Sequence, residues 1–165
     1  MSLDRIWAGW RAAYIADITG RDAPDDACVL CRLADESDPE GLIVQRSEHA
    51  FVVMNAYPYT SGHVMIAPLR HEARLDRLDP DEALEVMTLV QQATTALTTA
   101  YAPDGLNVGA NLGRAGGAGV PGHVHVHVLP RWLGDTNFVT TVADARVLNE
   151  DLQTSWKRLR EAWPE

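Results

Sequence analysis

Three histidines alternate with valines in one short stretch, and these are the side chains best suited to chemistry. His123, His125 and His127 are half of the six histidines in the chain. Side chains at every second position of a β-strand share one face, so the spacing predicts that the three imidazoles line one face while the valines point into a core. Gly122 and Pro130 flank the predicted strand. The plainer interpretation is a solvent-facing strand rich in histidine, or a buried row of satisfied histidines.

Two chemistries suit a row of imidazoles. Neutral imidazole is a common metal ligand, so the row can hold a catalytic metal ion. Alternatively, one ring nitrogen can attack phosphorus while a neighbouring imidazole handles protons or charge. Alternate Cα atoms of an extended strand lie roughly 6.6 Å apart. All three rings can therefore converge on one ion only if the strand is bent.

The segment before the histidine row is rich in glycine and leads straight into it. Residues 111–122 read Asn-Leu-Gly-Arg-Ala-Gly-Gly-Ala-Gly-Val-Pro-Gly. Glycine lets backbone N–H groups approach an anion closely, and successive N–H groups can form a concave anion-binding nest. A flexible hairpin turn has a similar composition. Next to the histidine row, however, the segment makes phosphate the leading substrate group.

The combination resembles the signature of the histidine triad (HIT) family of nucleotidyl hydrolases and transferases. The matching segments are residues 28–31, 51–55, 61–68 and 123–130. The continuation at residues 131–138 and the Trp-Ala-Gly-Trp-Arg segment at residues 7–11 resemble a bacterial branch of that family. The branch includes diadenosine tetraphosphate phosphorylases and is similar to the fragile-histidine-triad hydrolases of dinucleoside polyphosphates.

The resemblance implies an enzyme that cleaves adenine dinucleoside polyphosphates of the diadenosine tetraphosphate class. By this match, His125 attacks the α-phosphorus and forms a covalent nucleotidyl-histidine. His127 stabilises phosphoryl charge or protonates the leaving oxygen, and His63 supports the nucleophile. Water or inorganic phosphate can be the acceptor. Two alternatives stay open: a metal-dependent phosphohydrolase that uses the histidine row as ligands, and a nucleotide-binding module without catalysis.

The same match suggests which residues bind the nucleotide. Asn55 corresponds to an asparagine that contacts the ribose, although an asparagine at a strand end also favours a turn. Asn111 and loop N–H groups, including those of Gly117 and Gly119, are predicted to hold the α-phosphate. The family loop often carries glutamine or serine where this chain has Gly119 and its neighbouring valine, so backbone donors must replace side-chain donors. The flat ring of Trp132 can stack on adenine, or belong to the core or a dimer interface.

Cys28 and Cys31 form a CxxC pair, which suits a redox site, a zinc site or two packed thiols. A disulfide is disfavoured in the cytosol, and the chain has no further cysteine. In zinc-containing members of the family, two histidines complete the site, and their positions match His71 and His123. The resemblance therefore implies a closed structural Cys2His2 zinc site. In that case His123 orients the strand and does no chemistry.

Hydrophobic spacing and turn signals predict the elements that must position these residues. Five strands are expected, at residues 42–46, 50–55, 62–69, 106–110 and 123–129. Asp79, Pro80 and Glu82 form a strong helix start, because they supply a cap, a first-turn proline and a capping-box carboxylate. A long helix is predicted from about Pro80 to Ala102, and a C-terminal helix over residues 148–163.

These elements predict the α+β class, with an antiparallel sheet of about five strands, one long helix and a C-terminal helix. The length of 165 residues suits a single domain over residues 1–165, with residues 1–27 as an N-terminal arm. Residues 137–142 can form a further extended segment. The resemblance implies a homodimer whose sheets join across the interface.

Composition narrows the possible partners and locations. A net charge of −9 argues against a nucleic-acid polymer, although a nucleotide can still bind at a locally positive site. There is no apolar run long enough to span a membrane. The N-terminus lacks the apolar region of a signal peptide, which predicts a cytoplasmic protein.

Overall fold

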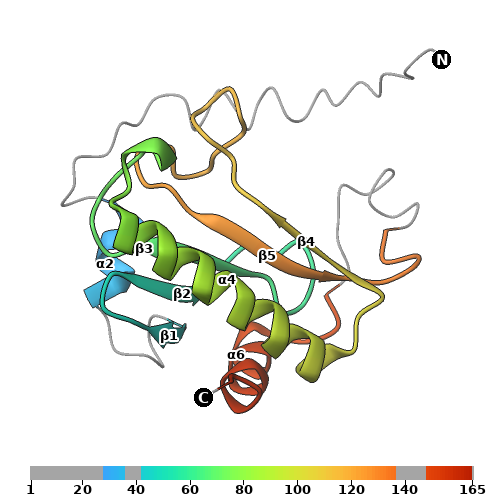
Figure 1. The fold of residues 1–165 in the computed structure, drawn as a ribbon. Coiled ribbons are helices and arrows are strands. Elements are labelled where there is room, and N and C mark those ends of the chain that lie inside the picture. The colour runs from blue at the N-terminus through green and yellow to red at the C-terminus, as the bar shows by residue number, and fades with distance from the viewer. Residues whose placement is uncertain (1–27, 36–41, 137–147, 165) are drawn as a thin grey trace.

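The structure is a computed structural model that describes residues 28–35, 42–136 and 148–164. In these residues one five-stranded antiparallel sheet is accompanied by three α-helices (Figure 1). The strands are β1 (Ile43–Arg46), β2 (Ala50–Met54), β3 (Val64–Pro68), β4 (Gly105–Gly109) and β5 (Val126–Arg131). The helices are α2 (Val29–Asp35), α4 (Pro80–Tyr101) and α6 (Leu152–Glu161), with a 3-10 turn η2 (Leu75–Arg77). The predicted α+β class is confirmed.

The strand order is β1-β2-β3-β5-β4, which places β3 and β5 side by side inside the sheet. Met65 of β3 pairs with His127 of β5, and Gly109 of β4 pairs with the other side of His127. The predicted arm at residues 1–27 and the predicted extended segment at residues 137–142 lie outside the described residues. No helix in the described ranges combines the length and apolarity needed to cross a membrane.

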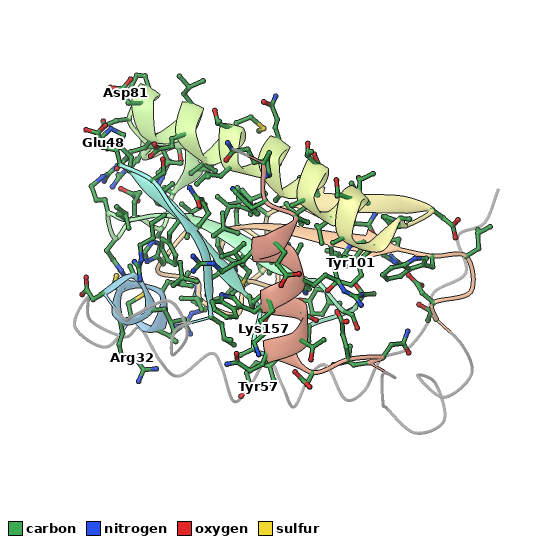
Figure 2. All side chains as sticks on the ribbon, turned by 90° about the horizontal axis from the view of Figure 1, so that it is seen from below. Arg32, Glu48, Tyr57, Asp81, Tyr101 and Lys157 are labelled. Carbon is green, nitrogen blue, oxygen red and sulfur yellow. The ribbon has the colours of Figure 1, made fainter. Side chains whose placement is uncertain are left out.

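Both faces of the sheet are covered, which explains why β2 is buried along its whole length. Successive side chains of a strand point to opposite faces. Val52 belongs to the core that α4 and α6 cover, whereas Phe51 and Val53 belong to the cluster around α2. Figure 2 shows α4 and α2 on opposite sides of the strands. The continuous apolar runs of β2 and β3 follow from this two-sided burial.

The long helix α4 follows its prediction closely. It begins at Pro80, and the Glu82 carboxylate accepts a hydrogen bond from the Asp79 N–H at 2.9 Å. It ends where Ala102 adopts a left-handed conformation with φ of 43°. Start and stop are both local signals, so the bounds could be predicted without knowledge of the fold.

The C-terminal helix is shorter than predicted. The predicted range began at residue 148, but α6 starts at Leu152 because the Asp151 carboxylate caps it by accepting the Thr154 N–H at 2.8 Å. Trp156 donates its indole N–H to the Ile43 carbonyl at 2.7 Å. This bond ties α6 to the edge strand β1.

The prediction for the histidine strand was wrong at both ends. Strand β5 begins only at Val126, and Pro130 lies inside it, paired with Leu106. The segment before Val126 leaves the sheet because the Val124 N–H donates to the Glu72 carbonyl at 2.7 Å instead of to a neighbouring strand. The three histidines therefore do not form one row on one strand.

Candidate functional site

The departure from the strand divides the triad between two side-chain clusters. His123 lies with Cys28, Cys31 and His71, a group called here the Cys-His cluster. His125 and His127 lie with His63, and these three form the second group, the histidine cluster: the ring centroids of His125 and His127 are 4.9 Å apart and those of His63 and His127 are 5.1 Å apart. The three triad imidazoles engage different partners, which argues against one metal ion held by all of them.

The Cys-His cluster brings together four ligand atoms that lie within 4.8 Å of one another. The His123 Nδ1 atom is 3.4 Å from the Cys28 sulfur and 3.5 Å from the Cys31 sulfur, and the His71 Nδ1 atom is 3.2 Å from the Cys31 sulfur. A tetrahedral zinc ion with ordinary bond lengths separates its nitrogen and sulfur ligands by about 3.6 Å. The cluster therefore has the residues and the spacing for a metal ion.

The protonation of His123 also suits a metal ligand. Its Nε2–H donates to the Pro68 carbonyl at 2.9 Å, so Nδ1 keeps its lone pair toward the thiols. A hydrogen bond from the ring nitrogen that does not face the metal fixes the tautomer of a metal-bound histidine. The ring is fully buried, which is typical of a closed structural site.

Helix α2 supplies the two sulfurs. Cys28 precedes the first residue of the helix and Cys31 lies in its first turn. The Arg46 guanidinium donates to the Leu33 and Ala34 carbonyls at the other end of α2, where a positive charge complements the helix dipole. The Arg46 side chain, at the end of β1, thus helps to hold the short helix against the sheet.

In the histidine cluster, His125 is held in one tautomer by the backbone. Its Nδ1–H donates to the His123 carbonyl at 2.8 Å, which leaves the Nε2 lone pair available. The side chain is buried, and burial lowers the pKa of His125, since desolvation disfavours the imidazolium. A neutral imidazole with a free Nε2 is the form that can attack phosphorus.

His127 is the member of the histidine cluster that reaches a cavity. Its Nδ1 atom lies 3.0 Å from the His63 Nε2 atom. Burial, with repulsion from His125 as the second cause, lowers the pKa of His127 to about 4. The ring is therefore neutral at physiological pH.

The cavity has a volume of about 740 Å³ and lies over β4, β5 and the loops at their ends. Of the residues predicted to bind nucleotide, Asn111 and Trp132 line it together with His127. The Trp132 ring is held edge-on by Tyr101, with ring centroids 6.2 Å apart. Tyr101, labelled in Figure 2 near the C-terminal end of α4, donates its hydroxyl to the Glu150 carboxylate before α6.

Two predicted phosphate-binding positions, both in the glycine-rich loop, lie outside the lining of this cavity. The Gly117 N–H donates to the Arg114 carbonyl at 2.9 Å, so that donor is used within the turn. Gly117 has φ of 88°, a conformation that explains the glycine by itself. Gly119 is at the end of the same turn and does not line the cavity. The loop is thus built as a compact turn.

Asn55 is buried beside His63 and does not line the cavity. Its Oδ1 atom accepts the Tyr57 N–H at 3.0 Å, and its Nδ2 atom is 3.3 Å from the His63 Nδ1 atom. The Tyr59 N–H donates to the same His63 nitrogen at 3.1 Å. The structure therefore brings Asn55 into contact with a histidine, and sequence analysis had no signal for the Tyr59 contact because the donor is a backbone group.

Arg131 is the cationic residue that lines the cavity, and sequence analysis missed it. Its guanidinium binds both carboxylate oxygens of Asp135, at 2.6 and 2.8 Å, and the Asn107 Oδ1 atom at 2.7 Å. The ion pair holds the pKa of Asp135 well below its usual range. The need for a locally positive site in a chain of net charge −9 was the signal that could have identified it.

Comparisons with known proteins identify related sequences and structures. The family model described as the HIT domain matches residues 37–132. AP-4-A phosphorylase of Mycobacterium tuberculosis is 35% identical over 165 aligned residues, which cover 98% of this chain and 85% of that protein. The asymmetrical bis(5'-nucleosyl)-tetraphosphatase of Schizosaccharomyces pombe is 31% identical, over 56% of this chain and 50% of that protein.

Solved structures give the same relationship. A crystal structure of a Zn-bound histidine triad family protein from Mycobacterium smegmatis superposes with a TM-score of 0.68 at 26% identity, over 84% of this chain and 94% of that one. The match of the family model to more than half of the chain, together with the full-length relative, shows that the chain belongs to the histidine triad (HIT) family.

Proposed function

We propose that this protein cleaves dinucleoside polyphosphates of the diadenosine tetraphosphate class through a covalent nucleotidyl-histidine on His125. The observation that carries the proposal is the hydrogen bond from His125 Nδ1 to the His123 carbonyl, which leaves Nε2 as a neutral nucleophile. The names of the relatives, AP-4-A phosphorylase and bis(5'-nucleosyl)-tetraphosphatase, support the substrate class.

The proposed reaction has two displacements. First, the His125 Nε2 lone pair forms a bond to the α-phosphorus while the bond to the bridging oxygen breaks, and the polyphosphate leaves with that electron pair. Second, an oxygen of water or inorganic phosphate attacks the same phosphorus, and the electron pair of the P–N bond returns to Nε2, which restores the neutral imidazole. An attacking water releases its proton to solvent, whereas a phosphate oxyanion has no proton to release. Positioning and charge stabilisation dominate such phosphoryl transfers.

Residues in and beside the cavity are proposed to bind the remaining parts of the substrate. Asn111 in the cavity lining and the backbone N–H of Gly119 outside it are proposed to hold the α-phosphate. Arg131 is proposed to bind the outer phosphates in exchange for the Asp135 carboxylate that it binds here. Trp132 is proposed to stack on adenine, since it lines the cavity and Tyr101 holds its ring at a fixed angle. Asn55 and Gly117 keep their proposed nucleotide contacts only if the substrate draws them away from the hydrogen bonds that they make here.

A structural zinc ion belongs to the same proposal. Cys28, Cys31, His71 and His123 would hold it, and its chemistry would be to fix the segment before His125 without entering the reaction. The related protein described as Zn-bound supports this choice of metal. A cysteine pair that binds a metal ion suits a reducing compartment, so a cytoplasmic location is part of the same proposal.

The homodimer implied by the family resemblance stays a proposal. Strand β4 is an edge of the sheet, and most of its residues are exposed, including Val108. An exposed edge strand is a ready surface for pairing with a second copy. Light scattering coupled to gel filtration would measure the mass directly, and a monomer at micromolar concentration would overturn this part of the proposal.

Product analysis tests the reaction. Diadenosine tetraphosphate would be incubated with and without inorganic phosphate, and the nucleotides separated by ion exchange. ADP and ATP that appear only with phosphate mean a phosphorylase, whereas AMP and ATP without phosphate mean a hydrolase. In parallel, acid-labile AMP on the peptide that carries His125 would be sought by mass spectrometry. If neither products nor an adduct appears, the proposed reaction is wrong, and the nucleotide-binding module without catalysis is the alternative.

A further inference from the structure

We propose that His127 works as a neutral hydrogen-bond donor through its Nε2–H, and not as a general acid. The backbone N–H of Tyr59 and the Asn55 amide are the positioning groups that set this state, acting through His63. The inference rests on the proposed function for its consequence in catalysis, but the proton positions themselves can be measured without any substrate.

The first link is the pair of donors on one nitrogen of His63. A backbone N–H can only donate, so the Tyr59 N–H at 3.1 Å requires that His63 Nδ1 accept. The Tyr57 N–H bonds the Asn55 oxygen, which orients the amide NH2 group of Asn55 toward the His63 ring, with Nδ2 nearest to Nδ1. An imidazole whose Nδ1 accepts a hydrogen bond carries its single proton on Nε2.

The second link is the contact through which the proton position of His63 sets that of His127. The His63 Nε2 atom is 3.0 Å from the His127 Nδ1 atom. Because His63 Nε2 carries the proton, it is the donor, and His127 Nδ1 must accept. His63 is fully buried, so water cannot replace His127 as the hydrogen-bond partner of His63 Nε2. The proton of neutral His127 therefore sits on Nε2.

This arrangement opposes a second proton on His127. A proton on Nδ1 would face the Nε2–H of His63, and both groups would then be donors. The rings of His63, His125 and Tyr59 have centroids within 6.0 Å of the His127 ring. Arg131 and Asp135 line the same cavity as His127, and the Asp135 carboxylate is bound at both oxygens by the Arg131 guanidinium. His127 lines the cavity, so its Nε2–H is the group that it can offer to a phosphate oxygen.

The consequence is a preference among leaving groups. A neutral imidazole N–H stabilises developing negative charge by a hydrogen bond, but it does not hand over a proton as an imidazolium does. A polyphosphate departs as a stable anion and needs no proton. An amine leaving group of a nucleoside phosphoramidate does need one. The site is therefore suited to polyphosphates and unsuited to phosphoramidates.

Nitrogen NMR of the metal-loaded protein without substrate tests the proton positions. In a long-range ¹⁵N–¹H spectrum of ¹⁵N-histidine-labelled protein at pH 7, an unprotonated ring nitrogen resonates far downfield of a protonated one. We expect the downfield signal at Nδ1 for both His63 and His127, with assignments made by substitution of each residue. A protonated Nδ1 on His127, in either the neutral ring or the imidazolium, would overturn the inference.

A matched pair of variants tests the consequence. The amide of His63→Gln can still donate to His127 Nδ1. The carboxylate of His63→Glu can only accept, so it requires a proton on His127 Nδ1, and its negative charge favours the imidazolium, which can act as a general acid from Nε2. We expect the rate ratio of adenosine phosphoramidate to diadenosine tetraphosphate to be higher in His63→Glu than in His63→Gln by roughly 100-fold, the low end of a general-acid contribution. Equal ratios, in variants whose thermal melts show a folded state, would contradict the inference.

A second pair addresses the backbone donor itself, should a buried glutamate prevent folding. Tyr59→Pro removes the N–H that fixes His63, and Tyr59→Ala removes the side chain but keeps the N–H. Two tautomers of His63 are expected in the proline variant and one in the alanine variant; a single tautomer in both would rule out the role of the backbone donor. Failure to form an adduct on His125 would overturn the proposed function and leave these results unchanged.

Discussion

The two clusters share one short segment of chain but use their imidazoles in opposite ways. In the Cys-His cluster, His123 presents Nδ1 to the thiols and donates from Nε2 to the Pro68 carbonyl. In the histidine cluster, the Nδ1 atoms of His125 and His127 contact protein groups, the His123 carbonyl and the His63 ring. Their Nε2 atoms are the ones proposed to act on the substrate. Identical side chains thus receive different chemistry from the backbone groups and side chains beside them.

The difference follows from where each ring nitrogen meets a fixed donor or acceptor. A carbonyl oxygen requires a proton on the nitrogen that faces it, and a backbone N–H requires a lone pair. Residues two positions apart on the chain therefore become a metal-ligand candidate and a nucleophile candidate without any change of residue type.

Substitution of the nucleophile should give the largest effect. We expect His125→Ala to lower kcat/KM for diadenosine tetraphosphate by roughly 10⁴-fold or more, because the covalent step has no substitute. The thermal melt and the metal content should change little, because the Cys-His cluster is left intact. His49→Ala, at a turn away from both clusters, serves as the control; near-normal turnover by folded His125→Ala protein would disprove the assignment.

Removal of a thiol should lower the stability of the protein and should affect the catalytic step only through that loss. Cys28→Ser is expected to lose the metal and to lower the free energy of unfolding by about 3 kcal/mol or more, since binding of a structural metal is coupled to folding. Metal analysis and urea denaturation measure both quantities. A chelator should reproduce the loss in the wild-type protein. If Cys28→Ser keeps its stability but loses turnover, the metal is catalytic and the contrast between the clusters fails.

The pKa of His127 predicts a pH dependence of stability. This pKa is lowered to about 4 from 6.5, by burial first and by His125 second. Between these values the unfolded chain binds a proton that the native protein does not, so the free energy of unfolding falls as the pH falls from 6.5 toward 4. Urea denaturation across this range measures the slope. His127→Gln should reduce the slope without abolishing it, because burial lowers the pKa of His125 as well, and equal slopes in both proteins would contradict the assigned cause.

A neutral His127 also predicts a flat rate profile. Turnover of diadenosine tetraphosphate should be independent of pH between roughly 5 and 8, because this ring does not titrate there. A rate that falls as the pH rises through this range, measured at saturating substrate, would identify a general acid and remove the proposed role of the neutral donor.

The smallest effect on turnover is expected for substitution of Trp132, which lines the cavity. Trp132→Leu should raise KM roughly 10-fold with little change in kcat, since stacking of a base on an aromatic ring contributes about 1–3 kcal/mol. Trp132→Phe should recover most of the affinity. A large fall in kcat with unchanged KM would place Trp132 with the histidine cluster instead of with the base.

Several features of the protein were determined by the sequence by itself, because they depend on neighbouring residues. Helix α4 runs from Pro80 to Tyr101, close to the predicted range of about Pro80 to Ala102, since its first-turn proline and its capping carboxylate are local signals. The strands predicted at residues 50–55 and 62–69 contain β2 (Ala50–Met54) and β3 (Val64–Pro68). The resemblance to the family identified the four Cys-His residues before any geometry was known, and the structure brings them together.

Only the tertiary structure decided how the triad is divided and where its protons lie. Segment 123–125 leaves the sheet because of the Glu72 carbonyl, and His123 meets the Pro68 carbonyl, 55 positions earlier in the chain. The Tyr59 N–H reaches His127 only through His63, 64 positions away from it. Every residue except proline has the same backbone donor, so no residue type in the sequence marks these groups. Their effect depends on which ring nitrogen the fold places against them.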